Sequence, residues 1–262
     1  MGKPDKRLKT DRVGQERYNN KGSLMRIVKY RKGDDIDILF PEYDYIAKNK
    51  QYSNFVRGSI NCPYERTVNG VGYLGEGEAI VSIGRKNTDQ YDCWKRMLKR
   101  CYNEKFHIKS PTYTDCSVCE EWHNYQNFYK WYNQNYYEIP GEIMCLDKDI
   151  LIKGNKEYGP NACIFVPQRI NNLFIKRDKC RGDLPIGVCI NKRVNRYIAS
   201  SNDRNNQHIH LGYFDSPTKA FDVYKEYKEN LIKSIADDYY NKGLIPIELY
   251  EAMYNWSIDI DD

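Results

Sequence analysis

The sequence predicts a modular α+β fold, and three observations support this. Apolar residues alternate with polar ones, or form short β-branched runs, through about the first 60 residues and again between 186 and 214. Two intervening stretches repeat aromatic and aliphatic residues at helical spacing. The 262 residues are 40% hydrophobic and 29% charged, which is typical of a globular chain with room for two or three small domains. We expect domains at 1–64, 65–180 and 181–262.

Residues 1–64 are expected to form a small N-terminal β domain, a twisted sheet or SH3-like barrel, preceded by a basic arm. The candidate strands are LMRIVKYR, DIDILF and YSNFVRGSI, and the turn between the first two is RKGDD. The arm, GKPDKRLKTDR, has two interpretations. It enters the minor groove of a nucleic acid, or it is a disordered terminus.

Residues 65–90 are rich in glycine and predict a linker followed by a strand, and two amphipathic helices come next. The apolar face of the first helix consists of Tyr91, Trp94, Met97, Leu98 and Cys101. Its other faces carry Lys95, Arg96, Lys99 and Arg100. The second helix lies in CEEWHNYQNFYKWYNQN and aligns Trp122, Tyr125, Phe128, Tyr129 and Tyr132. We expect the aromatic faces to be core and the basic side chains of the first helix to contact DNA.

The cysteines indicate a reducing compartment. There are nine at scattered positions, and no secretory signal opens the chain, so we expect free thiols in a cytoplasm. Cys116 and Cys119 form a CxxC, and zinc would need a second pair or the flanking His107 and His123. The favoured interpretation is two small residues at a helix entry. No apolar run approaches the roughly 20 residues of a membrane span, and we expect no membrane partner.

The segment 142–176 has the order strand, loop, strand, helix. The strands are IMCLDKDIL and CIFVP, and the long turn between them is IKGNKEYGPNA. The helix, QRINNLFIKR, starts after Pro167, which suits a first turn.

The last segment predicts a sheet of three short strands backed by one long helix. The strands lie in IGVCINKRVNRYIASSNDRNNQHIHLGYFD, and the helix has Ser216 as its cap and Pro217 at its first position. The final IPIELYEAMYNWSI predicts another short helix packed onto this unit.

The charge distribution favours a polyanionic partner. Residues 1–33 hold eleven Lys and Arg against three acids, while 85–109 and 172–212 each hold eight against three. From 213 onward the balance reverses to five against eleven. Three separate basic segments indicate a chain that meets nucleic acid at several places, although a single charge run is usually a solvated face.

The groups in 142–176 suit phosphodiester hydrolysis. Attack by water builds charge on the leaving oxygen, and one divalent cation held by carboxylate and amide oxygens neutralises that charge. A strand that ends in an aspartate and a helix that presents an amide can hold the ion from two sides. A loop asparagine can brace the backbone between them, and a neighbouring general base activates the water.

This motif resembles the HNH, or ββα-metal, endonuclease family. The resemblance implies a central ββα-metal core that binds Mg²⁺ (or Mn²⁺) through Asp147 and Asn171, with Asn161 as the central asparagine. Lys148 stands where the family has its general-base histidine. With W..ML.RCY upstream, the chain is similar to bacteriophage-encoded HNH-like proteins of the homing-endonuclease kind. Arg169, on the motif's helix, is a further candidate for DNA contact.

The lysine leaves the mechanism open. An ordinary lysine, with a pKa of about 10.4, is a poor base at neutral pH, but a nearby cation and burial would lower that pKa. Lys148 then acts as the base, or it stays charged and stabilises the transition state. Asp149 or Tyr158 can take the base role instead. In the remaining alternative, catalysis is lost and the fold survives as a DNA-binding platform.

The last domain resembles the Apetala-two (ethylene-response-factor) DNA-binding domain, through GV at 187–188, RYIA at 196–199 and HLGYFDSPTKAF at 210–221. That resemblance implies a three-stranded sheet in the major groove of DNA. By position, the contacting residues are Lys192, Arg193, Arg196 and Tyr197, with Arg204 on the next turn. The alternative is an exposed basic hairpin without specific readout.

Together these features predict a sequence-specific DNA endonuclease of the phage homing type. It would be a nickase if one site in a monomer cuts one strand per event. The expected partner is double-stranded DNA. Two rival hypotheses are a catalytically inactive DNA-binding protein, regulatory or anti-host, and an RNA-binding or host-interaction protein on the same scaffold.

Overall fold

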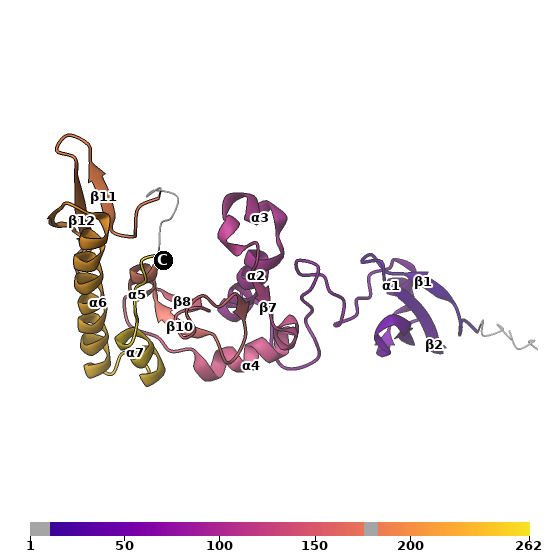
Figure 1. Ribbon diagram of the computed structural model, residues 1–262. Helices are drawn as coiled ribbons and strands as arrows, with labels where there is room; N and C mark the ends of the chain where they lie inside the picture. The colour runs from indigo at the N-terminus through magenta and orange to yellow at the C-terminus, as the bar shows by residue number, and fades with distance from the viewer. Residues whose placement is uncertain (1–10, 176–182) are drawn as a thin grey trace, which may run out of the picture. The chain divides into compact units, whose positions relative to one another are not determined.

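The computed structural model describes residues 11–175 and 183–262 and is a mixed α+β structure with several small sheets (Figure 1). It divides into two compact units, Met1–Asn133 and Gln134–Asp262. The predicted boundaries after 64 and 180 do not coincide with this division, and the three-domain organisation stays a prediction. The basic arm predicted at 2–12 lies outside the described residues except for its last two.

The first unit begins with a four-stranded antiparallel sheet in the order β1-β2-β3-β4. Its strands are β1 (Glu16–Tyr18), β2 (Leu24–Lys32), β3 (Asp35–Phe40) and β4 (Tyr45–Lys50). A 3₁₀ turn, η1 (Pro41–Tyr43), joins the last two. The alternating apolar side chains of β2 and β3 form a buried core with Met25, Ile27, Ile36, Ile38 and Phe40. The strands predicted at LMRIVKYR and DIDILF are confirmed.

The third strand predicted in this region is wrong. YSNFV forms the short helix α1 (Tyr52–Val56), and the missing strand is the preceding β4. The spacing of Tyr52 and Phe55 suits one helical face, where their rings stack with centroids 6.0 Å apart and Phe55 enters the sheet's core. Gly58, at φ +68°, ends the turn by donating its N–H to the carbonyl of Phe55.

The rest of the first unit carries the predicted pair of helices. A small hairpin of β5 (Ser82–Ile83) and β6 (Lys86–Asn87) leads into α2 (Asp89–Tyr102), which Thr88 caps. Then come α3 (Glu104–Lys109), η2 (Pro111–Tyr113), β7 (Ser117–Val118), η3 (Glu120–His123) and α4 (Tyr125–Asn135). As predicted, α2 buries Trp94, Met97, Leu98 and Cys101.

The second unit contains the motif and the C-terminal sheet. Its first elements are β8 (Met144–Asp147), β9 (Glu157–Tyr158), β10 (Ile164–Pro167), α5 (Gln168–Asn171) and η4 (Asn172–Phe174). The antiparallel sheet that follows consists of β11 (Val188–Asn191), β12 (Arg196–Asn202) and β13 (His208–Phe214). Two helices, α6 (Pro217–Asn241) and α7 (Ile247–Tyr254), complete it. The three strands, the cap at Ser216 and both helices are confirmed.

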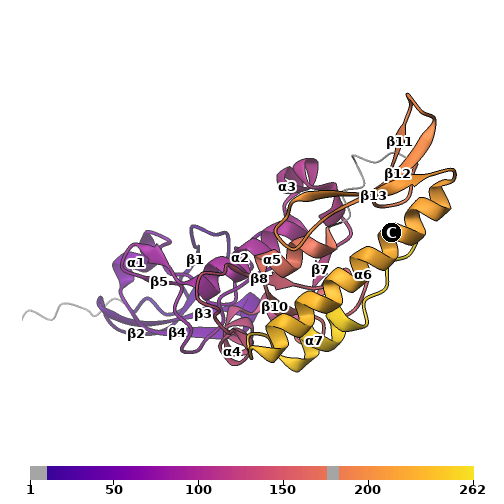
Figure 2. The same ribbon diagram turned by 90° about the vertical axis from the view of Figure 1, so that its left-hand side faces the viewer.

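Helix α6 is shared by two hydrophobic clusters of the second unit. Its first half buries Ala220, Phe221 and Tyr224 against the three-stranded sheet. Its second half and α7 pack on the β8–β10 hairpin and α5, where Val166 of β10 and Ile170 of α5 are fully buried. Figures 1 and 2 show the sheet at one end of α6 and α7 beside the other end. The long helix therefore connects the sheet to the motif within one unit.

In the part of the chain that the structure describes, no helix combines the length and the apolar character that a membrane span needs.

Candidate metal and nucleic-acid site

The segment 142–176 folds in the predicted order of strand, loop, strand and helix. β8 pairs antiparallel with β10, so that Asp147, the last residue of β8, lies opposite Ile164. α5 follows Pro167 directly and packs against both strands. Burial of Val166 and Ile170 fixes this packing. The aspartate at the end of the strand thus lies at one end of a small hairpin–helix unit.

Asp147 has a partly buried carboxylate that is oriented by its own loop. Its Oδ1 accepts N–H bonds from Asp149 (2.9 Å) and Ile150 (2.8 Å). Burial, followed by the negative charge of Asp149 and a hydrogen bond between the two side chains, raises the pKa of Asp147 to about 6. The two backbone donors oppose that increase without cancelling it. The ammonium of Lys148, 3.2 Å from Oδ2 of Asp149, is a positive charge beside this pair.

Lys148 is 7% exposed, and its ammonium is directed into the loop. Nζ donates to the carbonyl oxygen of Asn155 (2.7 Å) and to Oδ2 of Asp149 (3.2 Å). The Asp149 side chain is half exposed, so this ion pair lies at the rim of the loop. Lys148 therefore holds the two ends of the loop together. The predicted role as a base stays a prediction.

The loop is braced by an asparagine that the sequence did not single out. Asn155 Nδ2 donates to the carbonyls of Lys148 (2.7 Å) and Glu157 (2.6 Å), and its Oδ1 accepts the Glu157 N–H (3.2 Å). Asn161, the predicted central asparagine, is exposed in the turn that follows Gly159, where no side-chain hydrogen bond engages it among the described residues. The sequence signal that could have identified Asn155 is its place directly after Gly154 (φ +82°), because polar side chains stabilise tight turns of this kind.

Asn171, the second predicted ligand, is the last residue of α5 and is partly buried. The side-chain amides of the neighbouring residues Gln168 and Asn172 already have hydrogen-bond partners. Gln168 accepts from the Cys145 thiol (3.0 Å) and donates to Asn172 (2.9 Å). Tyr158, an alternative base, is 2% exposed, and Lys148 Nζ lies 6.0 Å from its ring centroid.

A hard divalent cation fits the residues present. Asp147 and Asp149 offer two neighbouring carboxylates, and burial together with the charge of Asp149 raises the pKa of Asp147, while the Lys148 ammonium already pairs with Asp149 at 3.2 Å. Among residues 11–175 and 183–262, no three His, Cys, Asp or Glu side chains gather into a metal cluster, so amide, water or phosphate oxygens would have to complete the shell.

The CxxC cysteine Cys116 and the flanking His123 both have contacts within the protein. Cys116 is buried, with its thiol directed at the Thr112 carbonyl (3.8 Å). The imidazole of His123 lies between Glu120 (2.9 Å) and the hydroxyl of Tyr102 (3.2 Å).

The predicted basic surface of α2 is present on the solvent side of that helix. Lys95, Arg96 and Lys99 are exposed, while Arg100 is half-buried with its guanidinium 5.8 Å from the ring centroid of Tyr113. Lys95, Arg96 and Lys99 are therefore accessible to solvent, and their contact with DNA stays a prediction.

The three-stranded sheet separates its predicted contact residues between two faces. Tyr197 is partly buried and packs with Phe214 against the cluster that contains Val188, on the face that α6 covers. Arg196 lies on the opposite, exposed face and bonds to the Tyr213 carbonyl (3.3 Å) and to Asp215 (3.2 Å). Lys192 and Arg193 are exposed in the turn between β11 and β12. Alternation along β12, which places successive side chains on opposite faces, explains the separation.

Arg169 and Arg204, predicted from different segments, come together. Arg169 donates to the carbonyl of Arg204 (2.7 Å), and Arg204 donates to the Ser234 carbonyl (2.9 Å) and lies 3.8 Å from Asp238. The pair thus joins α5, the β12–β13 turn and α6. A cavity of about 1120 Å³ that opens beside them is lined by these elements and β11.

Comparison of the chain with protein-family models, with curated proteins and with solved structures found no match.

Proposed function

We propose that this chain is a sequence-specific DNA endonuclease or nickase of the phage homing type, dependent on Mg²⁺ or Mn²⁺. The observation that carries the proposal is the β8–β10–α5 unit, with Asp147 at the end of its first strand. The carboxylate there is oriented by two N–H groups, and its pKa is raised to about 6 by burial and by Asp149. A buried carboxylate with a raised pKa beside a second carboxylate is a candidate for binding a cation.

Each residue of this site has a proposed role. Asp147, with Asn171, would hold the cation, and Asp149 adds the second negative charge beside it. When bound, the ion would neutralise charge that develops on the phosphate oxygens. Asp149, or Lys148 in its neutral form, would take the proton from the attacking water, and Asn155 holds Lys148 in place through two hydrogen bonds. The proposal requires α5 to run back along β8, so that the amide of Asn171 faces Asp147.

The finer domain identities belong to the same proposal. The four-stranded sheet would be an SH3-like domain, the β8–β10–α5 unit a ββα-metal core, and the three-stranded sheet with α6 an Apetala-two-like reader of DNA. The antiparallel order β11-β12-β13, with one face on a helix and the other exposed, supports the last assignment. Such an arrangement leaves one face free to enter a groove.

Double-stranded DNA would be bound by cationic side chains of both units. On α2 these are Lys95, Arg96 and Lys99, and on the sheet Lys192, Arg193 and Arg196. Arg100, Arg169 and Arg204 also have packing or bridging contacts within the protein, and their contact with DNA stays a prediction, while Tyr197 packs on the face of the sheet that α6 covers. We propose a monomer that acts in the cytoplasm of a bacterial host.

Plasmid relaxation tests this function. We expect supercoiled DNA that carries a target to be nicked or cut with Mg²⁺ or Mn²⁺, and not with EDTA. Asp147→Ala should lose cleavage and keep most of its affinity for DNA, because it removes an ion ligand and no phosphate contact. Asp115→Ala, at an exposed aspartate of the first unit, is the matched control. Cleavage by Asp147→Ala at the wild-type rate would contradict the assignment.

A catalytically inactive DNA-binding protein is the second candidate, and one observation favours it. The ammonium of Lys148 is directed at a loop carbonyl, in a position that explains its burial without catalysis. In that case wild type binds duplex DNA but leaves plasmid intact under every metal tried.

A further inference from the structure

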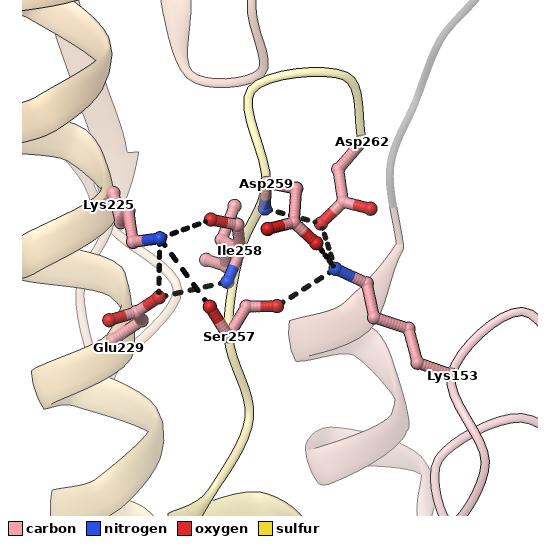
Figure 3. A network of polar contacts seen from close by, with 7 residues as sticks. All are labelled: Lys153, Lys225, Glu229, Ser257, Ile258, Asp259 and Asp262. Atoms are coloured by element: carbon pink, nitrogen blue, oxygen red, sulfur yellow. Dashed lines mark hydrogen bonds and ion pairs between the residues drawn. The ribbon is translucent and has the colours of Figure 1, made fainter.

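Residues 256–262, which we call the strap, contact the loop that carries Asp147 through the side chain of Lys153 (Figure 3). That loop, 147–155, contains Lys153, whose ammonium donates to the Ser257 carbonyl (2.9 Å) and to Oδ2 of Asp259 and Asp262 (both 2.6 Å). The three N–H donors of an ammonium thereby match three acceptors. The Lys153 side chain is one-third exposed, and Nζ also lies 5.7 Å from the ring centroid of Trp256.

The other side of the strap is fixed to α6 (Figure 3). Lys225 donates to the Ile258 carbonyl (2.8 Å), and Oε1 of Glu229 accepts the Ile258 N–H (2.9 Å). The Ile258 side chain is buried with Val188 and Phe221 beneath the three-stranded sheet. The strap therefore connects the loop of Asp147 to the helix and core that support the sheet.

The outer support acts on the exposed half of the loop. Ile150 is buried in the hydrophobic core and Leu151 packs against that core, whereas residues 152–154 are exposed and Ile152 is 52% exposed. Lys148 and Asn155 bond to each other across the base, so residues 152–154 are the part of the loop that opens most easily. Asp149 and Ile150, whose N–H groups orient the Asp147 carboxylate, lie between the base and the tip.

We propose that Lys153 and the strap are positioning elements for this loop: they hold it in the conformation in which Asp147 binds the ion. This role rests on the proposed function for its chemical meaning. The structural part stands separately, because it concerns the order of 147–155 and needs no cleavage to be measured.

Amide hydrogen exchange tests the structural part. In Lys153→Met, and in the double variant Asp259→Asn/Asp262→Asn, exchange in 148–155 should be about three- to tenfold faster than in wild type. Exchange in β11–β13 should stay unchanged. Lys156→Met, an exposed lysine of the same segment, is the control and should exchange as wild type does. Unchanged exchange in 148–155 in both variants would overturn the proposal, whatever the enzyme activity is.

Kinetics tests the functional part if wild type cleaves DNA. Lys153→Met should lower kcat about tenfold or more with KM for DNA unchanged, as expected for loss of active-site order. Lys153→Arg, which keeps the ion pairs, should recover most of the rate. A change in KM alone, or no rescue by arginine, would refute positioning. Absence of cleavage by wild type would reject the proposed function and leave the exchange result to decide on the strap.

Discussion

The buried ammonium of Lys148 has two partners in the loop, the Asn155 carbonyl and the Asp149 carboxylate. A buried acceptor that loses its donor costs about 1–3 kcal/mol. Lys148→Met should therefore lower the free energy of unfolding by that amount in urea titrations, with Lys156→Met unchanged. If Lys148 is also the base, the cleavage rate per folded molecule should fall on the order of a hundredfold. A lower stability with an unchanged rate would transfer the base role to Asp149 or to solvent hydroxide.

The charge of Asp147 is expected to serve function at a cost in stability, whereas the charge of Lys148 is expected to stabilise the loop. Its folded-state pKa of about 6 lies above the ordinary 3.8. The protein without metal is therefore favoured below pH 3.8 and loses stability as the pH rises through 6. Asp147→Asn retains an acceptor for the two N–H groups and carries no charge. In EDTA this variant should exceed wild type by about 3 kcal/mol above pH 6 and equal it below pH 3.8.

Metal should reverse that order at neutral pH. Added Mg²⁺ or Mn²⁺ would raise the melting temperature of wild type and leave that of Asp147→Asn where it was, because only the carboxylate gains by binding. Equal shifts for both proteins would show that the ion binds elsewhere.

At the scale of elements, Gly187 fixes the entry to β11. Its φ of +77° is a left-handed conformation, and a Cβ there would come within 2.1 Å of the Tyr224 ring on α6. Both the backbone strain and the clash oppose any side chain. Gly187→Ala should lower the free energy of unfolding by roughly 2–4 kcal/mol. Gly33→Ala is the control, since Gly33 has open space and no positive φ. Comparable stability of the two variants would contradict this account.

Elements marked by periodicity, caps or turn residues could be predicted from the sequence, and elements without such signals could not. The capped helix α6, the three strands before it and the order of β8, β10 and α5 follow from local patterns. YSNFV failed because five residues allow either period, and burial of Phe55 decided for the helix. Asn155 and Lys153 were missed for another reason. The partners of Lys153 lie more than 100 residues away, and no local pattern encodes such contacts.

At the scale of the whole molecule, the second unit joins a candidate cutting site to a candidate reading surface through α6 and the strap. Lys192, Arg193, Arg196 and Arg204 are exposed on the sheet and its turns, and Arg196 is paired with Asp215 while Arg204 bonds to Ser234. If the sheet reads DNA, binding energy should come from the turn and the outer face, and not from Tyr197 beneath them.

The salt dependence of DNA binding tests whether the turn and the outer face of the sheet, and not Tyr197, contact DNA. Arg193→Ala/Arg196→Ala should weaken duplex binding and reduce the slope of log K against log salt by about 1.8, because two phosphate contacts no longer release counterions. Lys48→Ala/Lys50→Ala removes the same charge from β4 of the first unit and controls for a general change in field. The single change Tyr197→Phe should leave affinity unaltered, because the ring packs on the face that α6 covers. An unchanged slope in the arginine variant, together with a large loss in Tyr197→Phe, would move the DNA-binding surface to the other side of the sheet and reject the reader proposed here.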